Sequence, residues 1–247
     1  MDLGLAGRVY LVTGGSKGLG FATARALVAD GARVVLSSRS QDNVDRAVAE
    51  LGDSAAGVAG DNADPELPER LVALARERFG RLDGMLVSVG GPPPGGVLDS
   101  DVAAWERAFE SVFLGTLRLL RTVAAELTDG GSIALVLSTS VREPLGNLAI
   151  SNGLRPGLAM TAKTLADELG PRGVRVVNLL PGVIATERWA ALMTTPDALE
   201  KRTAGVPLRR IGQPEEFGRV AAFVLSPAAS YLTGSTIAVD GGAVRSL

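Results

Sequence analysis

Residues 13–20 read TGGSKGLG, and they join two segments with different hydrophobic patterns. The preceding residues 9–12 form a short apolar run, which predicts a buried strand. The following residues repeat apolar side chains at helical spacing up to Asp30-Gly31, where the helix is expected to end. Glycines at such a turn let the backbone approach a diphosphate, whose charge is met by free N–H groups at the helix start. We therefore predict a dinucleotide site here, against the alternative of a tight turn without a ligand.

Predicted strands and helices alternate along the rest of the chain. Strands are expected at residues 32–39, 56–59, 84–89, 133–138, 174–180 and 236–240, and helices at residues 42–51, 66–79, 101–127, 156–169 and 214–225. Such alternation predicts an α/β fold of the doubly wound, Rossmann type, with a parallel sheet covered by helices on both faces. No break in composition divides the chain, so we expect a single domain over residues 1–247.

The end of the second predicted strand, Ser38-Arg39, is expected to select the cofactor. A carboxylate there would bind the ribose hydroxyls of NAD, whereas an arginine can pair with the 2′-phosphate of NADP. Lys17, inside the glycine turn, adds a second positive charge. Unless both are ordinary solvated cations, they favour NADPH over NADH. The pair Asp61-Asn62, after the third strand, is expected to border the adenine.

Two further segments are expected at the carboxyl edge of the sheet, where ligands bind in this type of fold. Residues 90–96, GGPPPGG, predict a stiff loop. Residues 185–213 are irregular and contain Trp189, Leu192 and Met193. This length and apolar content are typical of a lid over a substrate, or alternatively of a packed surface excursion.

The composition excludes several kinds of chemistry. The chain has no cysteine and no histidine, so it has no disulfide, no thiolate nucleophile and no imidazole for acid–base work or metal binding. The net charge is −2 and the sequence has no long basic run, so it does not indicate a surface that binds nucleic acid. No apolar run is long enough to cross a membrane, and residues 1–4 do not resemble a secretory signal, so we expect a cytoplasmic protein.

Several separated motifs resemble the short-chain dehydrogenase/reductase family, near the bacterial β-ketoacyl-carrier-protein reductases. They are TGGSKGLG at residues 13–20, Asp61-Asn62, Ser138, PGVIAT at residues 181–186 and YLTGSTIAVDGG at residues 231–242. The resemblance covers essentially the whole chain. It implies a sheet of seven parallel strands, a small-molecule substrate and a homotetramer assembled through the helices at residues 101–127 and 156–169.

The resemblance also implies that Ile184 and Thr186 hold the nicotinamide carboxamide. Together with the glycine turn and the strand ends, these positions make up the expected NADP(H) site. Its residues are Gly14, Ser16, Lys17, Gly18, Leu19, Gly20, Ser38, Arg39, Asp61, Asn62, Ser88, Gly90, Pro181, Gly182, Ile184 and Thr186.

The chain departs from the family at the usual catalytic positions. Val112 stands where the family has asparagine, Ser151 where it has tyrosine and Arg155 where it has lysine, so only Ser138 matches. In the family's mechanism NADPH gives hydride to a carbonyl carbon while the tyrosine hydroxyl, made more acidic by the lysine, gives a proton to the oxygen. A serine hydroxyl is a far weaker acid. An arginine stays charged, so it can stabilise an oxyanion but cannot readily supply a proton.

Pro156 is expected to place Arg155 at or before the start of its helix, because proline lacks an N–H and pushes its predecessor out of helical geometry. The candidate catalytic residues are therefore Ser138, Arg155 and, in the old position of the proton donor, Ser151.

Three functions remain open at this point. The first is an NADPH-dependent oxidoreductase that reduces a small carbonyl compound or a related electrophile. The second is a catalytically weak relative that binds NADP(H) as a sensor or partner subunit. The third is a non-redox enzyme that reuses the pocket. Ser138 and the PGVIAT motif favour the first, because mere capture of a dinucleotide does not require them.

Overall fold

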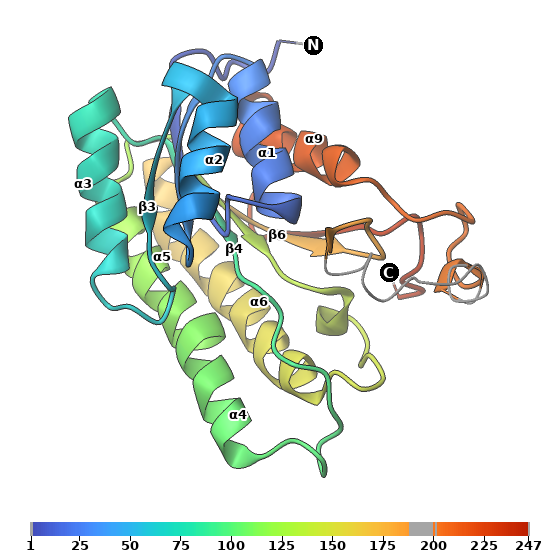
Figure 1. Cartoon of the computed structure of the whole chain (residues 1–247). Helices are drawn as coiled ribbons and strands as arrows, with labels where there is room; N and C mark the ends of the chain where they lie inside the picture. Colours follow the sequence, from blue (N-terminus) through green and yellow to red (C-terminus); the bar gives the residue numbers. More distant parts are fainter. Residues whose placement is uncertain (1, 188–199, 201, 247) are drawn as a thin grey trace.

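The computed structural model describes residues 2–187, 200 and 202–246. Seven parallel strands form one sheet in the order β3-β2-β1-β4-β5-β6-β7 (Figure 1). Their bounds are β1 Val9–Thr13, β2 Arg33–Ser38, β3 Ala55–Ala59, β4 Gly84–Ser88, β5 Ser132–Val136, β6 Arg175–Pro181 and β7 Ser235–Val239. The order reverses between β1 and β4. In a parallel sheet, such a reversal opens a crevice at the carboxyl ends of the two strands, where ligands bind.

Helices cover both faces of the sheet (Figure 1). On one face lie α1 (Gly18–Ala29), α2 (Gln41–Leu51) and α9 (Pro214–Leu225), and on the other lie α3 (Leu67–Phe79), α5 (Gly115–Glu126) and α6 (Ala149–Leu169). Short 3-10 turns lie at η1 (Gly52–Ser54), η3 (Thr139–Val141), η4 (Gly170–Arg172) and η5 (Pro227–Ala229).

Strand β1 shows why the strands are apolar throughout. Its side chains alternate, so that Val9 and Leu11 enter the core under α3, α5 and α6 while Tyr10 and Val12 enter the core under α1 and α9. A strand between two helical layers must bury both faces, and it therefore needs a continuous apolar run rather than an alternating one. The predicted parallel sheet and its Rossmann-type layers are thus confirmed.

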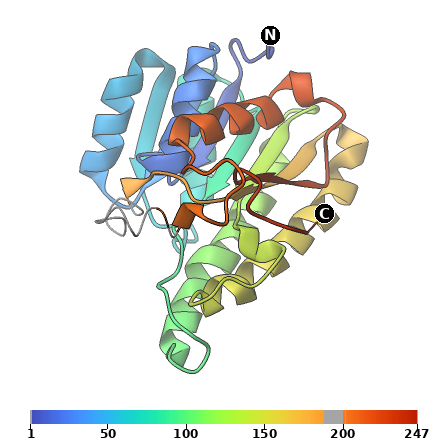
Figure 2. The same ribbon diagram turned by 90° about the vertical axis from the view of Figure 1, so that its right-hand side faces the viewer.

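The helix predicted over residues 101–127 is three consecutive segments. Helix α4 (Val102–Ala108) passes into a π-helical segment, η2 (Phe109–Leu114), and then into α5. The backbone stays helical across both joints. Helix α4 and the loop before it extend from the body of the molecule (Figure 2).

The prediction that a helix begins at Pro156 was wrong. Helix α6 begins at Ala149 and carries Pro156 in its interior. The first turns are held by Asn152, whose side chain accepts from Leu145 N at 3.1 Å and donates to Leu145 O at 2.9 Å. Ile150 and Leu154 bury their side chains in the core. This packing outweighs the cost of one proline in a helix interior, about 3 kcal/mol.

Part of the predicted lid lies outside the described residues. This part includes Trp189, Leu192 and Met193. Within the described ranges, no helix is long and apolar enough to cross a membrane.

The amino edge of the sheet is held by one buried carboxylate. Asp83, just before β4, accepts from Val9 N at 2.9 Å and from Arg81 Nε and Nη2 at 2.8 and 2.6 Å. Arg8 Nη1 lies 3.3 Å from the same carboxylate, whose side chain is fully buried. These bonds join the starts of the two central strands.

We expect Asp83→Asn to lower the free energy of unfolding by about 2–3 kcal/mol, because a buried charged acceptor with several donors is lost. Urea unfolding with an unchanged m-value measures the effect. Asp129→Asn is the matched control, since Asp129 pairs with Arg172 at 3.1 Å but is exposed. It should cost less than about 1 kcal/mol. Equal losses in the two variants would contradict a structural role for the buried carboxylate.

Candidate functional site

The glycine turn closes tightly between β1, β4 and α1. Gly14 has a φ of +57°, and a Cβ there would collide with the carbonyl oxygen of Ser88. A Cβ on Gly20 would collide with the carbonyl oxygen of Gly14. The turn therefore accepts only glycine at these points. It also brings the first turn of α1, whose N–H groups have no partner within the helix, to the crevice beside β4.

Backbone and hydroxyl bonds fix this turn to its neighbours. Thr13 Oγ1 donates to Ser88 O at 3.2 Å and accepts from Ser88 N at 3.0 Å. Gly15 N donates to Ser37 O, near the end of β2, at 3.0 Å. The ends of β1, β2 and β4 are thereby held together. Ser88 is the last residue of β4, and Gly90 lies in the loop that follows it.

The two predicted phosphate-binding cations lie at the same edge of the sheet. Arg39 directly follows β2, and Lys17 is the N-cap residue of α1 after β1. Both side chains are exposed. Lys17 Nζ forms an ion pair with Glu187 at 3.0 Å. This pair could not be predicted from the sequence, because its members are 170 residues apart.

Asp61 and Asn62 follow β3 at the same edge. Asp61 Oδ1 accepts from Ala63 N at 2.9 Å, which shapes the turn. The Asn62 backbone lies so close to Gly115 that a side chain at position 115 would collide with the Asn62 carbonyl oxygen. The predicted adenine border is therefore pressed against the start of α5.

The motif after β6 reaches back to the glycine turn. Gly182 N donates to Val239 O at 3.0 Å, and buried Ile184 forms a bridge with Gly212. A Cβ on Gly18 would stand 3.4 Å from Thr186 Cγ2. Two motifs far apart in the sequence, the glycine turn and PGVIAT, thus lie side by side.

Both candidate serines contact a third serine, Ser140. Ser138 Oγ accepts from Ser140 N at 3.1 Å, and Ser140 Oγ lies 3.3 Å from Ser151 Oγ. Ser140 and Ser151 are both buried. Sequence reasoning missed Ser140, although the run Ser138-Thr139-Ser140, shortly after the end of β5, was a visible signal.

Arg155 lies inside helix α6, and the prediction that it stands at or before the helix start was wrong. It is 5% exposed. Its Nη1 donates to Val136 O and Leu137 O, both at 3.0 Å, and its Nη2 donates to Val89 O at 3.4 Å. The guanidinium therefore joins the carboxyl ends of β4 and β5, one helical turn beyond Ser151.

Val112, where the resemblance implies asparagine, lies within the π-helical segment η2. It is 3% exposed and belongs to the core under α6. This position therefore contributes packing and no polar group to the crevice.

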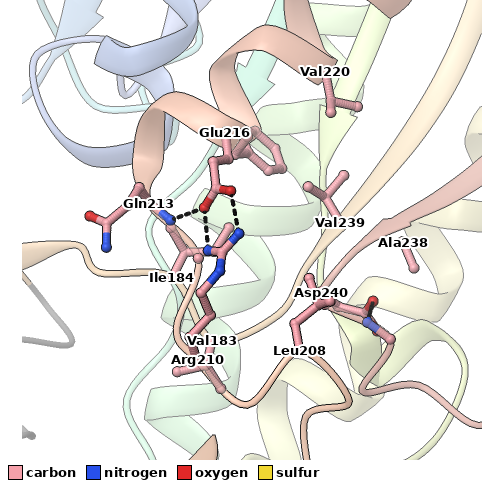
Figure 3. Close-up of a pocket in the computed structure, with 14 residues that line it drawn as sticks. Val183, Ile184, Leu208, Arg210, Gln213, Glu216, Val220, Ala238, Val239 and Asp240 are labelled. Carbon is pink, nitrogen blue, oxygen red and sulfur yellow. Dashed lines mark hydrogen bonds and ion pairs between the residues drawn. The ribbon is translucent and has the colours of Figure 1, made fainter.

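A cavity of about 520 Å³ lies between α9 and the end of β7 (Figure 3). Arg210 and Glu216 face each other on its wall, with Nη–Oε distances of 2.6 and 2.8 Å. The hydrogen bond from Arg210, with a second from the Gln213 N–H, lowers the pKa of Glu216 to about 2. Of the predicted site residues, only Ile184 lines this cavity. Its lining includes neither Ser138 nor Ser151.

Comparisons with known proteins agree with the fold. The family model described as enoyl-(acyl carrier protein) reductase matches residues 14–244. Dehydrogenase/reductase SDR family member 4 from Bos taurus is 38% identical over 250 residues, covering 98% of this chain and 89% of the relative. Dehydrogenase/reductase SDR family member 2, mitochondrial, from Homo sapiens is 36% identical over 246 residues, covering 98% and 88%. L-sorbose reductase from Gluconobacter frateurii, solved with NADPH and L-sorbose, superposes with a TM-score of 0.94 at 29% identity, covering 100% of both chains.

We expect Arg155→Met to lower the free energy of unfolding by about 2 kcal/mol, because buried carbonyl oxygens lose a charged donor. Arg155→Lys should cost less, since an ammonium keeps the charge and part of the bonding. Urea unfolding measures both. Arg121→Met, at an exposed position of α5, is the control and should be nearly neutral. If the two methionine variants unfold alike, the guanidinium does not hold the strand ends.

Proposed function

The chain belongs to the short-chain dehydrogenase/reductase family, and from this premise we propose that it is an atypical NADPH-dependent oxidoreductase acting on a small carbonyl compound or a related electrophile. The observation that carries the proposal is the meeting of the glycine turn with Thr186 at the crevice, beside the end of β4. The NADPH-bound L-sorbose reductase, with the same fold at 29% identity, supports it.

The residues of the crevice fit this cofactor. The turn excludes side chains at Gly14 and Gly20, which leaves backbone N–H groups to face a pyrophosphate. Lys17 and Arg39 supply two cations beside the ends of neighbouring strands, where a 2′-phosphate needs them. Ile184 and Thr186 are proposed to hold the nicotinamide carboxamide.

When bound, NADPH supplies the hydride, and the chain's own residues must manage the charge on the substrate oxygen. We assign Ser138 to donate a hydrogen bond to that oxygen, because it is the one candidate hydroxyl that is not buried. The fixed charge of Arg155 lies behind it at the ends of β4 and β5. Ser151 is buried against Ser140, so we assign it no proton transfer.

A second candidate function is an NADP(H)-binding sensor or partner subunit. It is favoured by the contacts of Ser151 and Arg155, which bond to Ser140 and to backbone carbonyls at the positions where the resemblance implies a tyrosine–lysine pair. A turnover screen of ketones, imines, quinones and activated alkenes with NADPH separates the two functions. A non-redox enzyme has no positive support in these residues.

The remaining expectations belong to the same proposal. We propose a homotetramer, in which partly exposed Phe109 of η2 and exposed Met160 of α6 are covered by another copy. We also propose one catalytic domain over residues 1–247, with residues 185–213 as its lid. The cytoplasmic location remains a prediction, since one relative is named as mitochondrial.

NADPH should bind at least tenfold more tightly than NADH, about 1.4 kcal/mol, because Lys17 and Arg39 meet the extra phosphate. Isothermal titration with both nucleotides measures the ratio. Arg39→Asp should reverse the preference. Arg33→Asp, at the other end of the same strand, makes the same charge change and should leave the ratio unchanged. Equal affinities in the natural protein, or an unaltered ratio in Arg39→Asp, would refute the strand-end assignment.

Hydride transfer should depend on Ser138 far more than on Ser151. Loss of one oxyanion donor typically costs about 2.7–4 kcal/mol of barrier, so Ser138→Ala should lower kcat about 100- to 1000-fold. Ser151→Ala should lower it by less than about tenfold, because its hydroxyl bonds Ser140 rather than substrate. Steady-state kinetics on the best screened substrate measures both. Comparable losses would make Ser151 a proton donor, and absence of turnover with intact NADPH binding would favour the sensor function.

A further inference from the structure

Glu187 pairs with Lys17, one of the two cations proposed to bind the 2′-phosphate of the cofactor. Its carboxylate lies 3.0 Å from Lys17 Nζ, and the residue before it, Thr186, lies against Gly18. The segment after β6 thus delivers a negative charge to the start of α1. Helix α1 has no acidic side chain of its own in its first turn.

The Glu187 carboxylate is negatively charged, as a phosphate is, but it carries less negative charge. A phosphoryl group carries about −1.5 to −2 charges near neutral pH, whereas a carboxylate carries one. The side chains of Lys17 and Glu187 are 45% and 73% exposed, so their pair is a weak and screened one. A 2′-phosphate that reached Lys17 would outcompete Glu187, but the ribose hydroxyls of NADH would not.

We propose that Glu187 sets the cofactor preference by competing with the 2′-phosphate of NADPH for the ammonium of Lys17. The proposal rests on NADPH binding as described above. NADPH must release Lys17 from Glu187 before it gains the full phosphate contact, whereas NADH binds with the ion pair intact. Glu187 therefore lowers the preference for NADPH below the value that Lys17 and Arg39 would give alone.

The variant Glu187→Gln tests this competition. The affinity for NADPH should rise about two- to fivefold, the range that an exposed ion pair is worth, and the affinity for NADH should stay unchanged. Adenosine 2′,5′-bisphosphate and 5′-AMP serve as fragments, because they differ at the 2′-phosphate and carry no nicotinamide. Titration calorimetry should record the same gain for the bisphosphate alone, and added salt should reduce it.

Two further variants separate competition from general repulsion. Glu126→Gln removes one negative charge from an ion pair with Arg76, 3.5 Å apart, on the surface of α3 and α5. It should change no nucleotide affinity. In a Lys17→Gln background, Glu187→Gln should give no gain, because no ammonium remains to be released. A gain that persists in this background, or that is equal for NADPH and NADH, overturns the competition.

The failures of the two proposals are distinguishable. If the natural protein binds neither NADPH nor the bisphosphate, the proposed cofactor is wrong and the role of Glu187 falls with it. If NADPH binds with the expected preference but Glu187→Gln leaves the ratio to NADH unchanged, only the role of Glu187 is refuted.

Discussion

The close approach of the turn after β1 to the end of β4 is the constraint on which the crevice depends. Gly14 and Gly20 leave no room for a side chain, so the chain can pass from strand to helix directly beside Ser88. This passage sets the direction of α1. Helix α9 then packs against α1 so closely that a side chain at Gly218 would collide with Ala22. The loop before α9 in turn holds Ile184 through Gly212. One tight turn thereby positions both ends of the predicted dinucleotide site.

The sequence predicted what local pattern determines. Strands buried on both faces need continuous apolar runs, and the close turn needs its glycines, so the sheet and the crevice could be read directly. The predicted helix start at Pro156 was wrong because the tendency of proline to begin a helix reflects local geometry alone. The actual start is fixed by the hydrogen bonds of Asn152 and by core packing. The π-helical segment could not be predicted, because its residues show the same apolar spacing as the α-helical residues around it. The ion pair between Lys17 and Glu187 depends on tertiary structure alone.

The two edges of the sheet use charge in opposite ways. At the amino edge, Asp83 is buried and surrounded by donors, which is the arrangement of a structural group. At the carboxyl edge, Lys17 and Arg39 remain exposed, where they can meet an incoming anion. Arg155 differs from both, since it is buried and donates hydrogen bonds to the backbone carbonyl oxygens of Val136 and Leu137.

This arrangement bears on the class of substrate. With Ser151 buried against Ser140, none of the catalytic residues proposed in the described part of the chain is a phenol that could donate the proton. Hydride addition to a quinone or an activated alkene forms an anion whose negative charge is spread by conjugation. Such an anion is less basic than the alkoxide formed from an isolated ketone, so its formation depends less on a proton donor. Water can then complete the protonation after hydride transfer. We therefore expect conjugated electrophiles to be better substrates than simple ketones, because the roles proposed for Ser138 and Arg155 would stabilise a delocalised anion without transferring a proton.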